Sequence, residues 1–111
     1  MLLNKDKIQK INLFENLTNS KVKNILDEER LIVIVEHGEL GKAIGKKGKN
    51  IKMVENIMHK KLKIVEFSND PIKFVSNFIY PIKVNEITLN DDVIEIKERD
   101  RKTKGLLIGR E

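Results

Sequence analysis

The sequence predicts an α+β fold in which a small domain is followed by an incomplete second copy of itself. Three observations lead to this prediction. Apolar residues recur at helical spacing in three segments of the chain, and short apolar runs typical of strands separate them. A shift of 64 residues superposes the first helical stripe on a later one. A chain of 111 residues has room for one complete compact domain or two very small ones.

The first elements are a short helix over residues 6–17 and two strands over 22–26 and 31–35. The apolar stripe of the helix is Ile8, Ile11, Phe14 and Leu17. The polar residues 27–30 between the strands suit a hairpin turn. Since the run Leu-Ile-Val-Ile-Val at 31–35 is apolar throughout, we expect it to lie inside the sheet.

Two helices and a strand complete the first domain. Gly38 and Glu39 open a short helical stretch that ends at Ile44, and residues 45–48 interrupt it. The longer helix that follows carries its apolar residues on one face: Ile51, Val54, Ile57 and Met58. Residues 62–67 return as a strand. Residues 1–68 are therefore predicted to form one domain in the order helix, strand, strand, helix, helix, strand.

The second copy begins at Asp70, a good helix N-cap that precedes Pro71 at the first helical position. The stripe of this helix is Ile72, Val75, Phe78 and Ile79, and Pro81 ends it. Residues 82–89 and 93–97 suit a hairpin around residues 90–92. The same shift superposes Gly41 on Gly105 and Gly45 on Gly109. Residues 69–111 are thus expected to be the N-terminal part of an incomplete second domain, and the chain to be a fragment.

Positive charge is concentrated in one stretch of the chain. Residues 41–63 hold eight lysines against the single acidic residue Glu55, although the formal net charge of the whole chain is only +5. This distribution favours a basic binding surface over a lysine-rich exterior without a partner, and the second interpretation stays open.

The decapeptide GKAIGKKGKN at 41–50 concentrates that charge beside glycines. Gly45 and Gly48 allow a sharp turn and leave no Cβ in the way of an approaching phosphate. The following helix is expected to direct free amides and its positive dipole end to the same place. Lys46 and Lys47 would face outward and contact backbone phosphates without reading bases. The spacing does not fit a nucleotide-binding P-loop, which requires Gly-x-x-x-x-Gly-Lys followed by Ser or Thr.

Several other classes of function are disfavoured. Without cysteine, and with only His37 and His59, no zinc site, metal or cofactor is expected. No serine or cysteine nucleophile has a plausible base, so we expect no enzyme activity. No aromatic residue lies between Phe14 and Phe67, which disfavours RNA-binding sheets that stack bases on aromatics. The N-terminus lacks signal-peptide features and no apolar run could span a bilayer, so a cytoplasmic protein without membrane contact is expected.

The segment LIVIVEHGELGKAIGKKGKNIK resembles the strand, Ile-Gly-x-x-Gly loop and helix of a KH domain, and the element order is that of the type II arrangement. With FSNDPIKFVSNFIYPIKV and KGLLIG after it, nearly the whole chain resembles the archaeal NusA-type family of transcription termination and antitermination factors. The resemblance implies that the RNA-binding residues are Gly45, Lys46, Lys47, Gly48, Lys49, Asn50, Lys42 and Ile44. In the partial second domain it implies Ile108, Gly109 and Arg110, without the closing glycine.

This resemblance implies a protein that binds single-stranded RNA during transcription, with the RNA polymerase elongation complex as a further partner. Two alternatives stay open at this point. One is a KH protein of ribosome assembly or translation, and the other is a domain whose basic surface docks an acidic protein.

Overall fold

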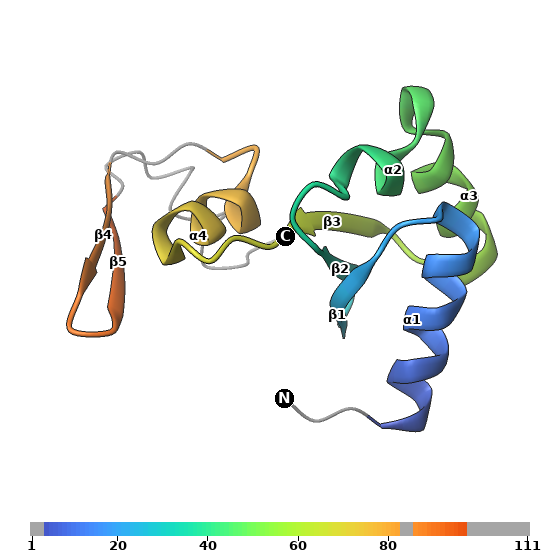
Figure 1. The fold of residues 1–111 in the computed structure, drawn as a ribbon, viewed down its shortest axis with the longest axis horizontal. Coiled ribbons are helices and arrows are strands. Elements are labelled where there is room, and N and C mark those ends of the chain that lie inside the picture. Colours follow the sequence, from blue (N-terminus) through green and yellow to red (C-terminus); the bar gives the residue numbers. More distant parts are fainter. Residues whose placement is uncertain (1–3, 83–85, 98–111) are drawn as a thin grey trace. The chain divides into compact units, whose positions relative to one another are not determined.

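The computed structural model describes residues 4–82 and 86–97 and divides the chain into two compact units, Met1–Phe67 and Ser68–Glu111. Seven elements follow one another in the first unit (Figure 1): α1 (Lys5–Thr18), β1 (Val22–Asp27), β2 (Leu31–Val35), α2 (Leu40–Ile44), the 3₁₀ turn η1 (Lys46–Gly48), α3 (Lys49–Met58) and β3 (Leu62–Glu66). This order confirms the predicted helix, strand, strand, helix, helix, strand.

Asparagines set both ends of α1. The Asn4 side chain accepts a hydrogen bond from the Lys7 amide at 2.8 Å, which is the usual N-cap contact. At the other end, Asn19 adopts a left-handed conformation with φ of 56°, and its amide donates to the Glu15 carbonyl. The helix therefore begins one residue before the predicted range and ends one residue after it.

The three strands form one mixed sheet in the order β1-β2-β3. β1 runs antiparallel to β2, with Ile25 opposite Val33, and β3 runs parallel to β2, with Ile64 opposite Val33. The run of apolar residues at 31–35 is therefore the central strand and lies inside the sheet, as predicted, with a paired strand on each edge.

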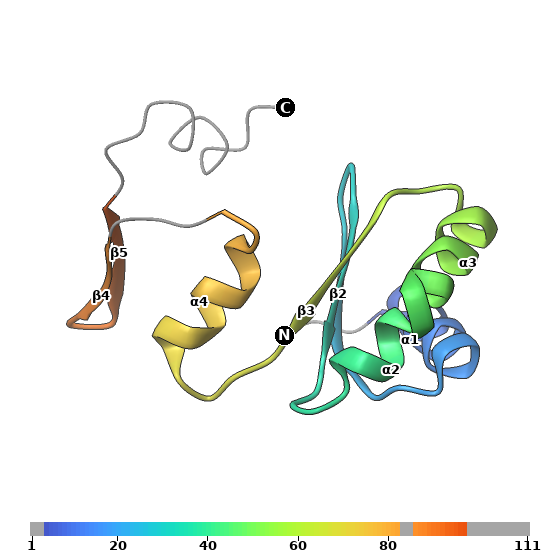
Figure 2. The same cartoon turned by 90° about the horizontal axis from the view of Figure 1, so that it is seen from above.

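The core of the unit lies between the sheet and its helices. All three helices cover the same face of the sheet (Figure 2). The buried residues on this face come from every layer: Phe14, Ile25, Leu31, Val33, Val35, Ala43 and Val54, each at most 1% exposed. Two residues of the predicted apolar stripes in this unit are exposed and not in the core. Ile8, in the first turn of α1, is 44% exposed. Ile57 is 46% exposed, because Val54 and Met58, four positions apart, take the inward side of α3 and leave Ile57 at the edge of the stripe.

An ion cluster ties the end of β1 to α1 and to the segment that follows α3. The Asp27 carboxylate accepts hydrogen bonds from the ammonium groups of Lys10 on α1 and Lys60 after α3. The Nζ of Lys10 also lies 2.9 Å from Oδ2 of Asp6. The hydrogen bond from Lys10, and then that from Lys60, lowers the pKa of Asp27, and the Asp27 and Asp6 contacts raise the pKa of Lys10. Asp27 therefore joins elements far apart in sequence.

Asp27→Asn is expected to lower the free energy of unfolding at pH 7 by about 0.5–1 kcal/mol, a modest value because solvent screens exposed pairs. Since the folded-state pKa is depressed, this stability is present above the pKa of an unfolded aspartate, about 3.9, and is lost as the pH falls through the lower folded-state value. Urea unfolding at pH 7, 4 and 2.5 checks this, with Glu28→Gln, an exposed neighbour, as the control. A difference between wild type and Asp27→Asn that is constant over this pH range would contradict the assignment.

The second unit contains α4 (Pro71–Ile79) followed by the hairpin β4 (Glu86–Asn90) and β5 (Val93–Lys97). The Asp70 side chain accepts from the Ile72 amide at 3.1 Å, which confirms the predicted N-cap. Asp91 and Asp92 both have positive φ, as a two-residue hairpin turn requires. A helix before an antiparallel hairpin repeats the order of α1, β1 and β2, and the assignment of residues 69–111 to a partial second KH domain stays a prediction. No helix in residues 4–82 or 86–97 is long and apolar enough to cross a membrane.

Candidate nucleic-acid interface

The loop between α2 and α3 is a single tight turn bounded by two glycines. α2 ends where Gly45 takes φ of 76° and ψ of 168°, and Gly48 opens α3 with φ of 74°. Between them, Lys47 has a left-handed backbone with φ of 56° and ψ of 30°. Glycine adopts such angles without strain, whereas a lysine there carries a conformational cost of about 1 kcal/mol or more. The turn therefore depends on both glycines and places a strained residue at its tip.

The two glycines have different surroundings. A Cβ built on Gly45 would lie 2.7 Å from the side-chain Cγ of Asn50 and 3.0 Å from the backbone nitrogen of Asn50, which is closer than a Cβ normally approaches such atoms. A Cβ built on Gly48 would meet nothing within 4 Å. Gly45 is thus required by packing inside the loop as well as by its backbone angles. Gly48 leaves open space through which a phosphate could reach the backbone.

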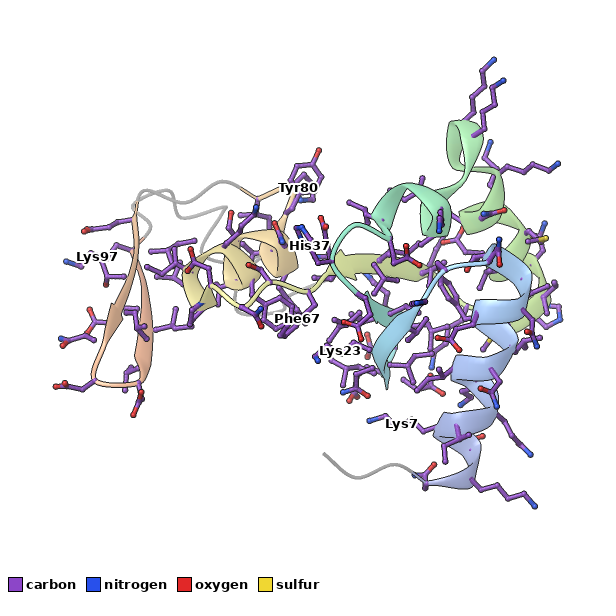
Figure 3. All side chains as sticks on the ribbon, viewed as in Figure 1. Lys7, Lys23, His37, Phe67, Tyr80 and Lys97 are labelled. Atoms are coloured by element: carbon purple, nitrogen blue, oxygen red, sulfur yellow. The ribbon has the colours of Figure 1, made fainter. Side chains whose placement is uncertain are left out.

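Positive charge gathers around this turn. Lys46, Lys47 and Lys49, called here the loop lysines, are all exposed. Figure 3 shows long side chains with nitrogen ends extending outward from the turn between α2 and α3. Lys42 is also exposed, but its Nζ lies 3.5 Å from Glu39 Oε2, one turn earlier. The structure therefore brings the predicted lysines together and gives one of them an acidic neighbour.

Two amides that were expected to face a ligand are used inside the loop. The Gly48 amide donates to the Gly45 carbonyl at 3.1 Å, and the Lys49 amide donates to the Lys46 carbonyl. The expectation of free amides is wrong at these two positions, because the 3₁₀ turn pairs each amide with the carbonyl three residues earlier. The loop lysines and the helix dipole of α3 remain as sources of positive potential.

The basic stretch at 41–63 does not form one surface. α3 separates the loop lysines from Lys60, Lys61 and Lys63, and its ten residues span roughly 15 Å. Lys60 pairs with Asp27, as described above. Burial lowers the pKa of Lys63, and the charge of Arg30 lowers it further. Only the N-terminal half of the stretch therefore belongs to the candidate site.

The two apolar residues before the loop are buried to different extents. Ile44 is half-buried, whereas its neighbour Ala43 is fully buried in the core cluster. Alanine fits here because α2 packs close to the sheet and other helices, where an isoleucine would be too large. Ile44 is left beside the loop with part of its apolar side chain accessible.

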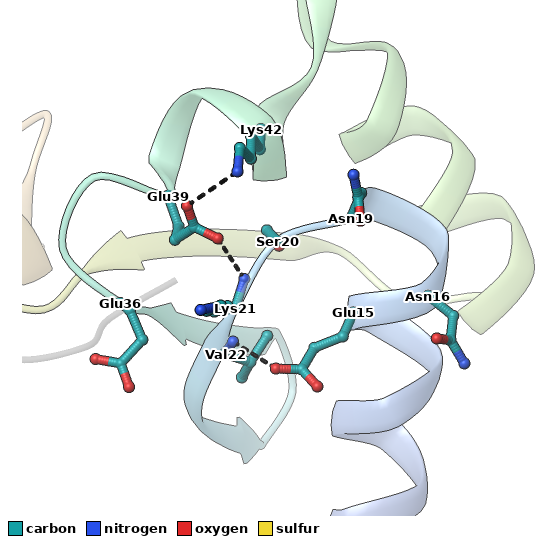
Figure 4. A pocket seen from close by; sticks show the side chains of 9 residues that line it. All are labelled: Glu15, Asn16, Asn19, Ser20, Lys21, Val22, Glu36, Glu39 and Lys42. Atoms are coloured by element: carbon teal, nitrogen blue, oxygen red, sulfur yellow. Dashed lines mark hydrogen bonds and ion pairs between the residues drawn. The ribbon is translucent and has the colours of Figure 1, made fainter.

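A polar hollow of about 630 Å³ is lined by residues of α1, β1 and α2 and of the segments that join them (Figure 4). Two of its carboxylates have structural partners. Glu15 accepts from the Val22 amide and Glu39 from the Lys21 amide, both at 2.8 Å. These contacts hold the start of β1, where a bulge shifts the register with β2. Sequence reasoning missed Glu15 and Glu39 because each acts on a backbone group distant in sequence, which leaves no local pattern.

The predicted RNA-binding residues of the partial second domain are not part of the described structure. Ile108, Gly109 and Arg110 lie outside the described residues, and their role stays a prediction. In residues 4–82 and 86–97, no group of three or more His, Asp or Glu side chains could hold a metal ion. His37 is exposed, and its Nδ1 lies 3.3 Å from Oε2 of Glu66. His59 is the C-cap residue of α3 and has a left-handed backbone with φ of 53°.

Comparison with known families gives a match over the first unit. The family model described as the NusA-like second KH domain matches residues 2–70. The match overlaps residues 1–68, which were expected to form the first domain, and the exact domain bounds stay a prediction. The crystal structure of APE1850 superposes with a TM-score of 0.78 at 27% identity and covers 97% of this chain and 83% of that one. The α+β KH-type fold expected from the sequence is thereby confirmed.

Curated relatives extend the similarity over nearly the whole chain. Proteins described as probable transcription termination protein NusA are 33% identical in Methanocaldococcus jannaschii, 31% in Methanococcus vannielii and 32% in Halococcus morrhuae. The alignments cover 96%, 95% and 94% of this chain and 61%, 64% and 77% of the respective relatives. The chain thus spans less than two thirds of the length of the first two.

Proposed function

Because the chain belongs to the family of NusA-like KH domain proteins, we propose that it binds single-stranded RNA as part of the transcription machinery, in termination or antitermination. The loop at residues 45–48 holds the RNA backbone in this proposal, and the protein performs no chemistry of its own. The RNA polymerase elongation complex is its proposed macromolecular partner.

The observation that carries the proposal is the combination of the exposed loop lysines with the open space over Gly48. Phosphate oxygens attract lysine ammonium groups as point charges, and a glycine without a neighbouring side chain allows the backbone of the ligand to come close. The half-buried Ile44 offers an aliphatic surface beside the loop for a base. Such a site reads the RNA backbone more than its sequence.

Wild-type protein is expected to bind a labelled single-stranded RNA of about eight nucleotides with a log–log salt slope of about −2 to −3.5. This slope corresponds to roughly three to five neutralised phosphates at about 0.7 each. Fluorescence anisotropy from low to moderate salt measures it. A duplex RNA of the same length is the control, because bases paired inside a duplex cannot reach the aliphatic surface of Ile44.

Binding that is absent at low salt, or equal for single-stranded and duplex RNA, would contradict the proposal. Co-purification then separates the remaining interpretations. Recovery of RNA polymerase supports a role in transcription, whereas recovery of ribosomal subunits instead would favour ribosome assembly or translation. An acidic protein partner retained after RNase treatment would favour the protein-docking alternative.

A further inference from the structure

We propose that Asn50 is a positioning residue that holds the loop at residues 45–48 in its binding conformation before RNA arrives. The family resemblance implied that Asn50 contacts RNA. In the structure its side-chain amide instead has a partner within the protein. The inference rests on the proposed function for its consequence in RNA binding, and its structural part concerns the RNA-free chain.

The Asn50 amide joins the two helices across the loop. Its Nδ2 donates to the Lys42 carbonyl at 2.8 Å. Lys42 lies in α2 and Asn50 is the second residue of α3, so this bond connects both ends of the turn. In a longer helix the Lys42 carbonyl would accept from the amide four residues later, but α2 ends before that residue. The Asn50 side chain supplies the donor that the helix lacks.

Gly45 makes room for this contact. The Asn50 side chain occupies the space that a Cβ on residue 45 would fill, since its Nδ2 would lie only 2.9 Å from that Cβ. A side chain at position 45 would therefore displace the Asn50 amide from the Lys42 carbonyl. Gly45 and Asn50 act as a pair, and the first glycine of the loop serves this internal hydrogen bond.

A loop held at both ends loses less conformational freedom when a ligand binds. Without the Asn50 side-chain amide, the turn that carries Lys46 and Lys47 keeps its backbone hydrogen bonds but loses the link from α3 to α2. RNA affinity should then fall even though no lysine is lost. The salt slope should stay the same, because the number of neutralised phosphates does not change.

Amide hydrogen exchange in the RNA-free protein tests the structural part directly. The amides of Gly48 and Lys49 report on the loop because both donate within it. In Asn50→Ala these two amides are expected to exchange roughly 2- to 12-fold faster, the range that corresponds to loss of one hydrogen bond. Asn50→Asp keeps the shape but has no donor at neutral pH, and it should have the same effect. Asn56→Ala, an exposed position on the same helix, should leave both rates unchanged.

A double-mutant comparison tests the pairing of Asn50 with Gly45. Gly45→Ala should accelerate exchange of the Gly48 amide by a larger factor in wild type than in Asn50→Ala, because the second background lacks the side chain that a Cβ would strike. Equal factors in both backgrounds would overturn the pairing.

The outcomes separate this inference from the proposed function. Unchanged exchange in both Asn50 variants overturns the positioning role, and weaker RNA binding with unchanged exchange would make Asn50 a direct RNA contact. Faster exchange supports the positioning role of Asn50 even if the wild type binds no RNA, in which case the proposed function alone has failed. Faster exchange together with weaker binding at an unchanged salt slope supports both.

Discussion

Reversing the charge of both residues at the tip of the loop, Lys46→Asp/Lys47→Asp, is expected to weaken single-stranded RNA binding by about 100-fold. Each ammonium–phosphate hydrogen bond contributes about 1.5 kcal/mol, and a factor of ten in affinity corresponds to about 1.4 kcal/mol. The log–log salt slope should move toward zero by about 1.4, since two phosphates at about 0.7 each lose their counter-charge. Anisotropy titrations of the variant and the wild type at several salt concentrations measure both effects.

The matched control for this variant is Lys5→Asp/Lys61→Asp, which makes the same change in net charge. Both lysines are exposed, and they lie on α1 and just before β3, away from the loop. The control should reduce affinity only slightly, because charges beyond about 10 Å are largely screened at 0.1 M salt. Equal losses in the two double variants would mean that net charge alone attracts RNA and that the loop has no special part.

Phe14→Ala is expected to remove most of the stability of the first unit. The Phe14 ring is 1% exposed and belongs to the core cluster between α1 and the sheet. Truncating a buried phenylalanine costs about 3–5 kcal/mol. A domain of this size has a total stability of roughly 3–10 kcal/mol. Urea unfolding followed by far-UV circular dichroism should show a transition shifted to much lower urea or already begun in its absence.

Leu13→Ala on the same helix is the control for this core variant. Leu13 is 40% exposed, so its truncation should cost under about 1 kcal/mol and leave the unfolding midpoint close to that of the wild type. RNA binding should follow the folded fraction in both variants, because neither side chain belongs to the loop. A Phe14→Ala protein as stable as Leu13→Ala would contradict the assignment of Phe14 to the core.

The elements of the fold were predictable because their signals are local in the sequence. The apolar stripe of α1, the central strand at 31–35 and the caps at Asp70 and Pro71 all follow from spacing within a few residues. The exposure of Ile57 was less predictable. It depends on which neighbours compete for the same buried surface, and a single-chain pattern does not contain that information.

The site was predictable only in outline. Glycines and lysines mark the turn between α2 and α3, but three of its properties depend on contacts that no pattern encodes. The Lys42 carbonyl accepts a hydrogen bond from Asn50 Nδ2, and the Gly48 and Lys49 amides donate to carbonyls inside the turn. Ala43, and not Ile44, is the fully buried residue. The pairing of Lys60 with Asp27 joins residues 33 positions apart and removes that lysine from the basic surface. A pattern in the sequence does not reveal such long-range pairs, because the partners meet only in the folded chain.

The parallel pairing of β2 with β3 has a consequence for the order in which the protein is assembled. Leu31 lies opposite Leu62, so this half of the sheet forms only when a crossover of about thirty residues has closed. The antiparallel pair β1–β2 joins residues close in sequence and can form early, whereas non-local parallel pairing is intrinsically slow. The glycine-lysine turn lies inside that crossover. On a ribosome, the local hydrogen bonds of this turn can form as soon as residues 42–50 have emerged, whereas the pairing of β2 with β3 must wait until residue 66 has left the exit tunnel.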